Sequence, residues 1–362
     1  MQKRKLNWAF ITDQHFGCRN DSKIFHKLFR KFYTEVFIPY LKENEIKTLF
    51  VLGDVFDRRK FINFESLKLS REIFFDPLKE MGIKVYAIVG NHDVMYKNTN
   101  SVNSMDLLVS EHHYDNVSVY SEPTTIVVDD VKVLMLPWIN SENYASSIDA
   151  IKHSEARFVF SHLEMKGFEY HRGMVSEHGH CDADLLARYE YVFSGHYHHR
   201  SSRGNIHYLG TPNEMNWSDY NDPKGFHTFD GKTLRFIENP EKTFIRLVYN
   251  DTNPKKIENG MGQLGSFEDK FLKVVIQRKE HPILFERFID KIAESSPFDI
   301  NIIDETNSVK VLSDSTDELP KDTLEVIKNF VYNELETDLS KEKLMRKLQT
   351  IYIAAKAFAD DE

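Results

Sequence analysis

Five short polar motifs contain the residue types that bind metal ions and act on phosphate esters. Aspartate, histidine and asparagine supply oxygen and nitrogen ligands, and two divalent cations about 3.5–4 Å apart need a carboxylate between them. A glycine beside a ligand lets the backbone turn sharply and lets a phosphate approach closely. In chain order the motifs are Asp13-Gln14-His15, Gly53-Asp54 with Asp57, Gly90-Asn91-His92-Asp93, Ser161-His162 and Gly195-His196-Tyr197-His198. Together they predict a site for two metal ions.

Each motif stands at, or within a residue or two of, the end of an apolar run typical of a β-strand. These runs are Leu6–Thr12, Lys47–Leu52, Lys84–Val89, Phe158–Phe160 and Tyr191–Phe193. Because active sites in α/β sheets gather at the carboxyl ends of strands, we expect the five motifs to converge. Taken alone, each motif has an ordinary explanation, such as a turn, a helix cap or a half-buried histidine. Five of them in this order, all at strand ends, favour a metal centre.

Helical periodicity separates the first strands and sets the expected fold class. Lys23–Glu43 and Glu65–Met81 are predicted helices, since apolar residues recur in them at spacings of three and four. Shorter strand-like runs follow from residue 116, namely Val117–Tyr120, Thr125–Val128, Lys132–Pro137 and Ile206–Leu209. Continuous apolar strands separated by helices indicate sheets covered on both faces. We therefore predict an α/β sandwich of two mixed sheets flanked by helices.

The second half predicts a smaller unit and a helical end. Asn250–Ser266, rich in Asn, Gly and Pro, reads as a connection. Beyond it we expect strands at Phe271–Gln277 and Ser308–Leu312 with a helix at Pro282–Glu294 between them, which makes a small α+β unit. Two further helices are predicted, Lys321–Leu335 and Ser340–Phe358. The predicted division is residues 1–249, 250–315 and 316–362.

Length, charge and cysteine content exclude several classes of protein. At 362 residues the chain exceeds the usual size of one hydrophobic core. No apolar run reaches about 18 residues, so we expect no membrane span. A net charge of -9 excludes a uniformly basic DNA-coating protein, so any nucleic acid must meet local basic patches and bound metal. Cys18 and Cys181 form no CxxC pair and indicate a reducing compartment, so we expect a cytoplasmic protein.

The five motifs closely resemble those of the calcineurin-like metallophosphoesterase family, which reads DxH, GDxxD, GNH[DE], a later lone His, and GHxH. The resemblance covers roughly Asn7 to Ile237 and implies a four-layered sandwich with a dinuclear site. Carried over position by position, it implies a first metal held by Asp13, His15 and His198. It implies a second metal held by Asn91, His162 and His196. Asp54 would bridge the two.

The same resemblance implies a catalytic role and a metal identity. His92 would lie outside the metal ligands and act on the departing oxygen of the phosphodiester. The mixed nitrogen and oxygen ligand set suits manganese, iron or zinc better than calcium. The family points to two manganese ions.

Within that family the sequence looks most like the SbcD-type nucleases, including the versions carried by large bacteriophages. GDVFDRR and GNHD match that branch, as does the stretch from Tyr208 to Pro212, whereas Arg59 stands where protein phosphatases have glycine. The resemblance implies a manganese-dependent DNA exonuclease or endonuclease subunit of a recombination and double-strand-break repair complex. It further implies a homodimer whose α+β unit caps DNA and whose closing helices bind a coiled-coil ATPase.

Several assignments stay open on the sequence alone. The basic residues nearest the motifs either contact the DNA backbone or are ordinary solvated charges; they are Arg58, Arg59, Lys60, Arg200 and Arg203. His171, His178 and His180 form either a third metal site or a polar loop at the mouth of the site. The same metal centre would also serve a phosphomonoesterase or protein phosphatase. A non-catalytic scaffold for the ATPase is a third reading, which the intact ligand set opposes.

Overall fold

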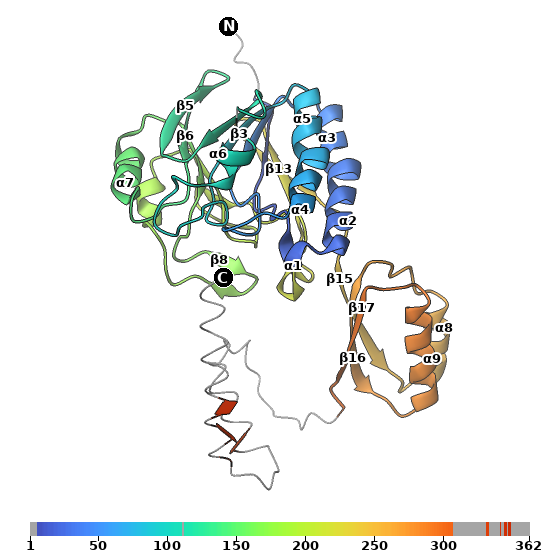
Figure 1. The fold of residues 1–362 in the computed structure, drawn as a ribbon. Coiled ribbons are helices and arrows are strands. Elements are labelled where there is room, and N and C mark those ends of the chain that lie inside the picture. The colour runs from blue at the N-terminus through green and yellow to red at the C-terminus, as the bar shows by residue number, and fades with distance from the viewer. Residues whose placement is uncertain are drawn as a thin grey trace. The chain divides into compact units, whose positions relative to one another are not determined.

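A computed structural model describes residues 6–110 and 112–306, with isolated positions between 331 and 348. Two six-stranded sheets form the larger part of the described chain (Figure 1). The first has the order β14-β13-β1-β2-β3-β4. Its strands are β1 (Trp8–Ile11), β2 (Thr48–Val51), β3 (Lys84–Ile88), β4 (Val117–Tyr120), β13 (Gly225–Phe229) and β14 (Leu234–Glu238). Strands β1 to β4 run parallel, and β13 pairs antiparallel with β1.

The second sheet has the order β11-β12-β10-β7-β6-β5. Its strands are β5 (Thr124–Val128), β6 (Val131–Leu136), β7 (Phe158–His162), β10 (Tyr191–Gly195), β11 (Ser201–Arg203) and β12 (Ile206–Tyr208). Strands β6, β7, β10 and β12 run parallel, and β5 and β11 are antiparallel edges. The predicted sandwich of two mixed sheets is confirmed.

Aromatic side chains fill the space between the two sheets. Trp8, Phe10 and Phe50 of the first sheet are fully buried against Phe160 and Phe193 of the second. The rings of Phe50 and Phe160 meet edge to face with centroids 4.5 Å apart. Such pairs contribute about 0.5–1.5 kcal/mol each beyond the area they bury. This core therefore fixes the two sheets, and with them the strand ends that carry the motifs.

Helices cover the outer face of each sheet. Those on the first sheet are α2 (Lys23–Phe32), α3 (Ile38–Glu43), α4 (Phe64–Ser70) and α5 (Asp76–Glu80), joined in pairs by the π-helical turns η1 (Tyr33–Phe37) and η2 (Arg71–Phe75). Each π turn is followed at once by a helix with a proline in its first turn, Pro39 or Pro77. Proline has no N–H to continue the regular ladder, which accounts for the wider turn. The predicted helices are therefore continuous but locally unwound.

The remaining short elements complete this part. On the second sheet lies α7 (Tyr144–His153), which Figure 1 shows on the flank opposite α2–α5. The others are α1 (Cys18–Asp21), α6 (Ser104–Leu108), η3 (Ala183–Leu186), η4 (Trp217–Asp219), and a hairpin of β8 (Glu169–His171) and β9 (Met174–Val175). No helix among the described residues is long and apolar enough to cross a membrane.

A three-stranded parallel sheet follows, in the order β15-β16-β17, with two helices packed on it. Its elements are β15 (Phe244–Asn250), α8 (Pro254–Met261), β16 (Phe271–Arg278), α9 (Pro282–Ala293) and β17 (Asp299–Asp304). This sheet begins at Phe244, upstream of residue 250. The prediction that 250–266 is only a connection was wrong, because Asn253 caps α8 and Met261 is buried against the sheet. The predicted strand at 308–312 and the two closing helices lie outside the residues that the structure describes continuously.

Candidate metal centre

The predicted ligands come together at the carboxyl ends of five strands from both sheets. Asp13, Asp54 and Asn91 follow β1, β2 and β3, while His162 ends β7 and His196 follows β10. Strands β7 and β10 pair in register, with Gly195 opposite His162. The structure therefore brings together side chains that are up to 185 positions apart in the sequence, from Asp13 to His198.

The backbone at these positions is strained. Asp13 (φ 49°), His15 (φ 48°), Asp54 (φ 52°) and His196 (φ 87°) all adopt positive φ, a region that costs a non-glycine residue about 1–2 kcal/mol. Such conformations persist only where the surrounding structure enforces them, and they cluster at functional sites. Four of the seven predicted ligand positions carry this strain, which aims their side chains into one space.

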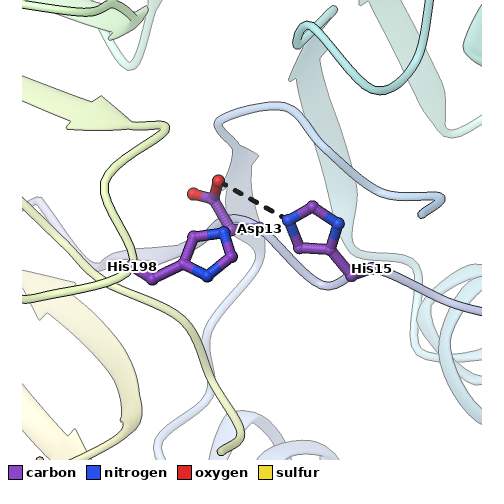
Figure 2. Close-up of side chains that lie close together, drawn as sticks. All are labelled: Asp13, His15 and His198. Carbon is purple, nitrogen blue, oxygen red and sulfur yellow. Dashed lines mark ion pairs between the residues drawn. The ribbon is translucent and has the colours of Figure 1, made fainter. Parts of the chain in front are cut away.

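The first group of potential ligands consists of Asp13, His15 and His198 (Figure 2). Their side chains point toward one another, with His15 Nε2 4.0 Å from Asp13 Oδ1 and 3.9 Å from Asp54 Oδ2. The Asp13 carboxylate also accepts the His196 N–H at 3.0 Å, which ties the first motif to the last. Asp54 thus lies between this group and the next, as a bridging carboxylate must.

The second group consists of Asp54, His162 and His196, with Asn91 among them. Asn91 Oδ1 lies 3.1 Å from His162 Nε2 and 2.9 Å from His196 Nδ1, and His162 Nε2 is 3.3 Å from Asp54 Oδ2. The other ring nitrogen of His162 donates to the Leu52 carbonyl at 2.6 Å. Because a carbonyl only accepts, this bond fixes the tautomer of the neutral ring, in which Nε2 has a lone pair that faces the group.

The donor set fits a divalent metal pair. Both ring nitrogens of His15 are buried and make no hydrogen bond, although Nδ1 is 3.2 Å from Asp57 Oδ1. Buried polar atoms normally have partners, so an imidazole without a hydrogen bond among three carboxylates fits a site for a cation. The motif glycines leave the needed room: a Cβ on Gly90 would lie 2.2 Å from Asp54 Oδ1, and one on Gly195 2.1 Å from Thr12 Oγ1.

Electrostatics divide the histidines into two kinds. Burial alone would lower the pKa of His15, but Asp57, Asp54 and Asp13 outweigh it and raise the pKa to about 9. The pKa of His162 is likewise raised to about 9, chiefly by Asp54 against the effect of burial. In contrast, burial and the neighbouring His162 lower the pKa of His196 to about 3. Although burial opposes it, the imidazoles of His162, His92 and His15 hold the pKa of Asp54 well below its usual range.

The predicted catalytic histidine lies beside the first group. His92 donates its backbone N–H to Asp54 Oδ1 at 2.7 Å, and its ring lies 4.8 Å from that of His15. Its Nδ1–H donates to the Asp57 carbonyl at 2.6 Å. The half-buried ring is therefore fixed on one nitrogen and has Nε2 left for a substrate. Whether His92 acts in catalysis stays a prediction.

Two residues without a predicted role hold the motifs in place. Asp93 is buried and accepts hydrogen bonds from the backbone N–H groups of Asp54, Val55, Phe56 and Gly90. Lys224 is also buried, pairs with Asp219 and Asp222 at 2.8 Å each, and donates to the His198 carbonyl at 2.8 Å. The sequence offered a signal only for Asp93, which closes the third motif.

The basic residues predicted to contact DNA differ in their surroundings and exposure. Arg58 pairs with Asn20 and Asp21 and lies over the Phe61 ring at 4.8 Å. The Arg200 guanidinium lies 3.8 Å from the centre of the Phe236 ring. Arg59 has one buried nitrogen that makes no hydrogen bond, and Lys60 and Arg203 are exposed. Their contact with DNA stays a prediction.

The histidine-rich loop is not a cluster. His178 is exposed, and His171 Nδ1 lies 3.5 Å from Ser218 Oγ. His180 does reach the site, because its ring meets Trp138 at 4.3 Å and Trp138 meets His196 at 5.0 Å. Among the described residues, no group of potential metal ligands contains any of these three histidines.

Comparison with known proteins agrees with this geometry. The calcineurin-like phosphoesterase family matches residues 7–200, a range that contains all five motifs. The chain is also 34% identical over 323 residues to exonuclease subunit 1 of Enterobacteria phage T4, which covers 88% of this chain and 90% of that protein. The expected family is thereby confirmed. The chain belongs to the calcineurin-like phosphoesterase family.

Proposed function

We propose that the chain is the nuclease subunit of a DNA recombination and repair complex and hydrolyses phosphodiesters with two metal ions. The observation that carries this proposal is the convergence of the seven predicted ligands at one edge of both sheets, four of them on strained backbone. Its similarity over most of its length to a protein named exonuclease subunit 1 supports DNA as the substrate.

Two manganese ions are the proposed cofactor. Asp13, His15 and His198 would hold one ion, Asn91, His162 and His196 the other, and Asp54 both. When bound, such ions polarise the phosphate and activate water for attack on phosphorus. The residues of the chain fix the ligand atoms in advance, since hydrogen bonds to Leu52 and His196 already orient His162 and Asp13.

His92 is the proposed proton donor. Its Nδ1–H is committed to the Asp57 carbonyl, so Nε2 is the ring nitrogen left to face the substrate. In the doubly protonated imidazolium form, Nε2–H would give its proton to the leaving oxygen of the cleaved strand and leave the neutral ring with its Nδ1–H still bonded to Asp57. Asp57 lies 3.2 Å from His15 as well, which couples the donor's position to the first ligand group.

A phosphomonoesterase or protein phosphatase is the competing function on the same centre. The test incubates purified protein with end-labelled duplex DNA and manganese, in parallel with a phosphopeptide. We expect manganese-dependent shortening or nicking of the DNA and slow release of phosphate from the peptide. Rapid turnover of the phosphopeptide without any cut DNA would overturn the nuclease proposal.

The proposed macromolecular partner is a coiled-coil ATPase bound through residues 316–362. Truncation after Asp314 should then leave a manganese-dependent nuclease that no longer co-purifies with the ATPase. Loss of intrinsic nuclease activity on truncation would instead mean that this segment completes the nuclease itself. We place the complex in the bacterial cytoplasm, where phage and host DNA are available.

A homodimer is proposed through α4 and α6. Arg71, the first residue of η2 after α4, donates to the Leu108 carbonyl at the end of α6 at 3.2 Å. The two helices leave large apolar side chains in solvent, with Phe64 87% and Leu107 62% exposed. A two-fold interface would bury both patches at once. Phe64→Asp with Leu107→Asp should yield monomers in sedimentation, and an unchanged dimer would refute this interface.

A further inference from the structure

Trp138 forms an aromatic wall beside the second ligand group. It follows β6 at the same sheet edge as the metal ligands, and its indole ring is half-buried. The ring centre lies 5.0 Å from that of His196 and 6.1 Å from that of His162. A large flat side chain is thus partly exposed within contact distance of two residues at the proposed centre.

Hydrogen bonds hold the backbone of Trp138 in place. Its backbone N–H donates to the Val89 carbonyl at 2.9 Å, and its backbone carbonyl accepts from the side chains of Asn100 at 2.9 Å and Asn143 at 3.0 Å. Asn100 and Asn143 are themselves buried, and both bond to the buried Asn140. Such a network fixes the backbone from which the indole projects before any ligand arrives, which lowers the entropic cost of binding.

His180 supports the ring from a different segment. It meets Trp138 edge to face, at 4.3 Å and 90°. The His180 backbone N–H donates to the Glu164 carbonyl at 2.9 Å, while its Nδ1 accepts the Glu164 N–H at 3.3 Å. The two rings therefore make a perpendicular edge-to-face contact and are not stacked on each other.

We propose that Trp138, supported by His180, is a nucleobase-binding subsite that stacks on a base next to the scissile phosphate. Every base has a π-face, so stacking on an aromatic side chain holds a strand without reading its sequence. The indole lies on the side of Asn91, His162 and His196, so the stacked nucleotide would be the one whose phosphate meets that group. This inference rests on the proposed nuclease function and deepens it.

The test measures cleavage by wild-type and variant proteins on intact and altered DNA strands, with manganese present. The substrates are end-labelled DNA strands that carry a single abasic residue at successive positions, with the intact strand as reference. For the wild-type protein we expect removal of one base next to the cut to lower kcat/KM by about 5- to 150-fold. Trp138→Ala should lower kcat/KM on intact DNA by a similar factor and should be insensitive to that abasic residue.

Three comparisons keep this test interpretable. Trp138→Phe retains an aromatic face and should keep most of the sensitivity to the missing base, whereas Trp138→Leu retains apolar volume and should lose it. Tyr144→Ala removes another exposed aromatic side chain near the same loop and should behave like wild type. Manganese affinity, measured by titration calorimetry, should be the same in all variants that fold.

Two outcomes would overturn the subsite. One is an equal loss for Trp138→Ala on intact and abasic DNA, which would mean that the indole only shields the metal ligands. The other is wild-type cleavage that ignores every abasic position. Failure of the wild-type protein to cut any DNA would instead reject the nuclease function, so the two failures are distinguishable.

Discussion

Buried charged side chains at the edge of the two large sheets differ in their hydrogen bonding from a buried carboxylate in the three-stranded part. At the edge, Asp13, Asp54, His15 and His162 are all at most 2% exposed and crowd against one another, with His15 making no hydrogen bond. In the three-stranded part, Asp251 is equally buried, but its carboxylate accepts from the backbone of Glu280 and His281 and from the Tyr249 hydroxyl.

The difference separates a site built for ligands from an ordinary structural carboxylate. Asp251 is satisfied by its own chain and holds the start of α9, so it needs nothing from solution. The edge combines positive φ angles with buried carboxylates and imidazoles whose ligand atoms lie within 4.8 Å of one another. Unsatisfied charge in a folded interior is expensive unless a ligand or ion completes it. The edge should therefore depend on metal, and the three-stranded part should not.

The largest expected effect comes from Asp54, which faces both ligand groups. Asp54→Asn should abolish hydrolysis and lower metal occupancy to well below two ions, because one carboxylate serves both. Activity assays with metal analysis of the purified protein would measure this. Asp129→Asn, which keeps an acceptor for the Trp8 indole at the far end of the sheet, is the matched control. Near-normal activity in Asp54→Asn would refute a shared carboxylate.

The next effect separates chemistry from metal binding at the same edge. His92→Ala should lower kcat by about 10²–10⁴ while both metals and DNA still bind, since loss of a general acid has this typical cost. Single-turnover kinetics and metal analysis together measure it. His153→Ala, at an exposed position on α7, should change neither quantity. If His92→Ala lost a metal ion, His92 would be a ligand and not the acid.

Metal removal should destabilise the edge in a pH-dependent way. The pKa values of His15 and His162 are raised from 6.5 to about 9, so their protonated forms stabilise the metal-free fold below pH 6.5. That contribution is lost as the pH rises from 6.5 through about 9. In the presence of a chelator, the melting temperature should therefore fall as the pH rises from 6.5 through about 9. Added manganese should restore most stability at the alkaline end, where fewer protons compete, and a flat metal-free profile would contradict the assignment.

The smallest effect tests the three-stranded part. Asp251→Ala leaves the Glu280 and His281 N–H groups without acceptors, which should cost about 1–3 kcal/mol of unfolding free energy. Chemical denaturation measures the loss. Manganese-dependent hydrolysis of a small chromogenic phosphodiester should be unchanged in conditions where the variant is folded. A parallel loss of metal affinity would show that the two regions are not independent.

The candidate metal site at the sheet edge could be predicted from the sequence because the residue patterns that indicate it are local. An apolar run predicts a strand, and a polar residue at its end, in three of the five cases directly after a glycine, predicts a side chain at the sheet edge. Asp13, Asp54, Asn91, His162 and His196 each stand at or next to such a strand end. Parallel pairing aligns the strand ends within each sheet, and packing of the two sheets brings both sets together. Helix α8 was missed for the converse reason: its Asn, Gly and Pro residues resemble a loop, and only burial of Met261 on the sheet reveals the helix.

Only the tertiary structure decided which residues support the ligands. Lys224 lies 26 positions from His198 in the sequence and Trp138 lies 42 from His180, and nothing in either local stretch marks the partner. Their contacts arise because the β-strands of two sheets bring separate loops to one edge. A ligand's residue type is set by the chemistry of the metal and is visible in the sequence. A supporting residue is set by which loop happens to pack behind the ligand, and that depends on the three-dimensional path of the whole chain.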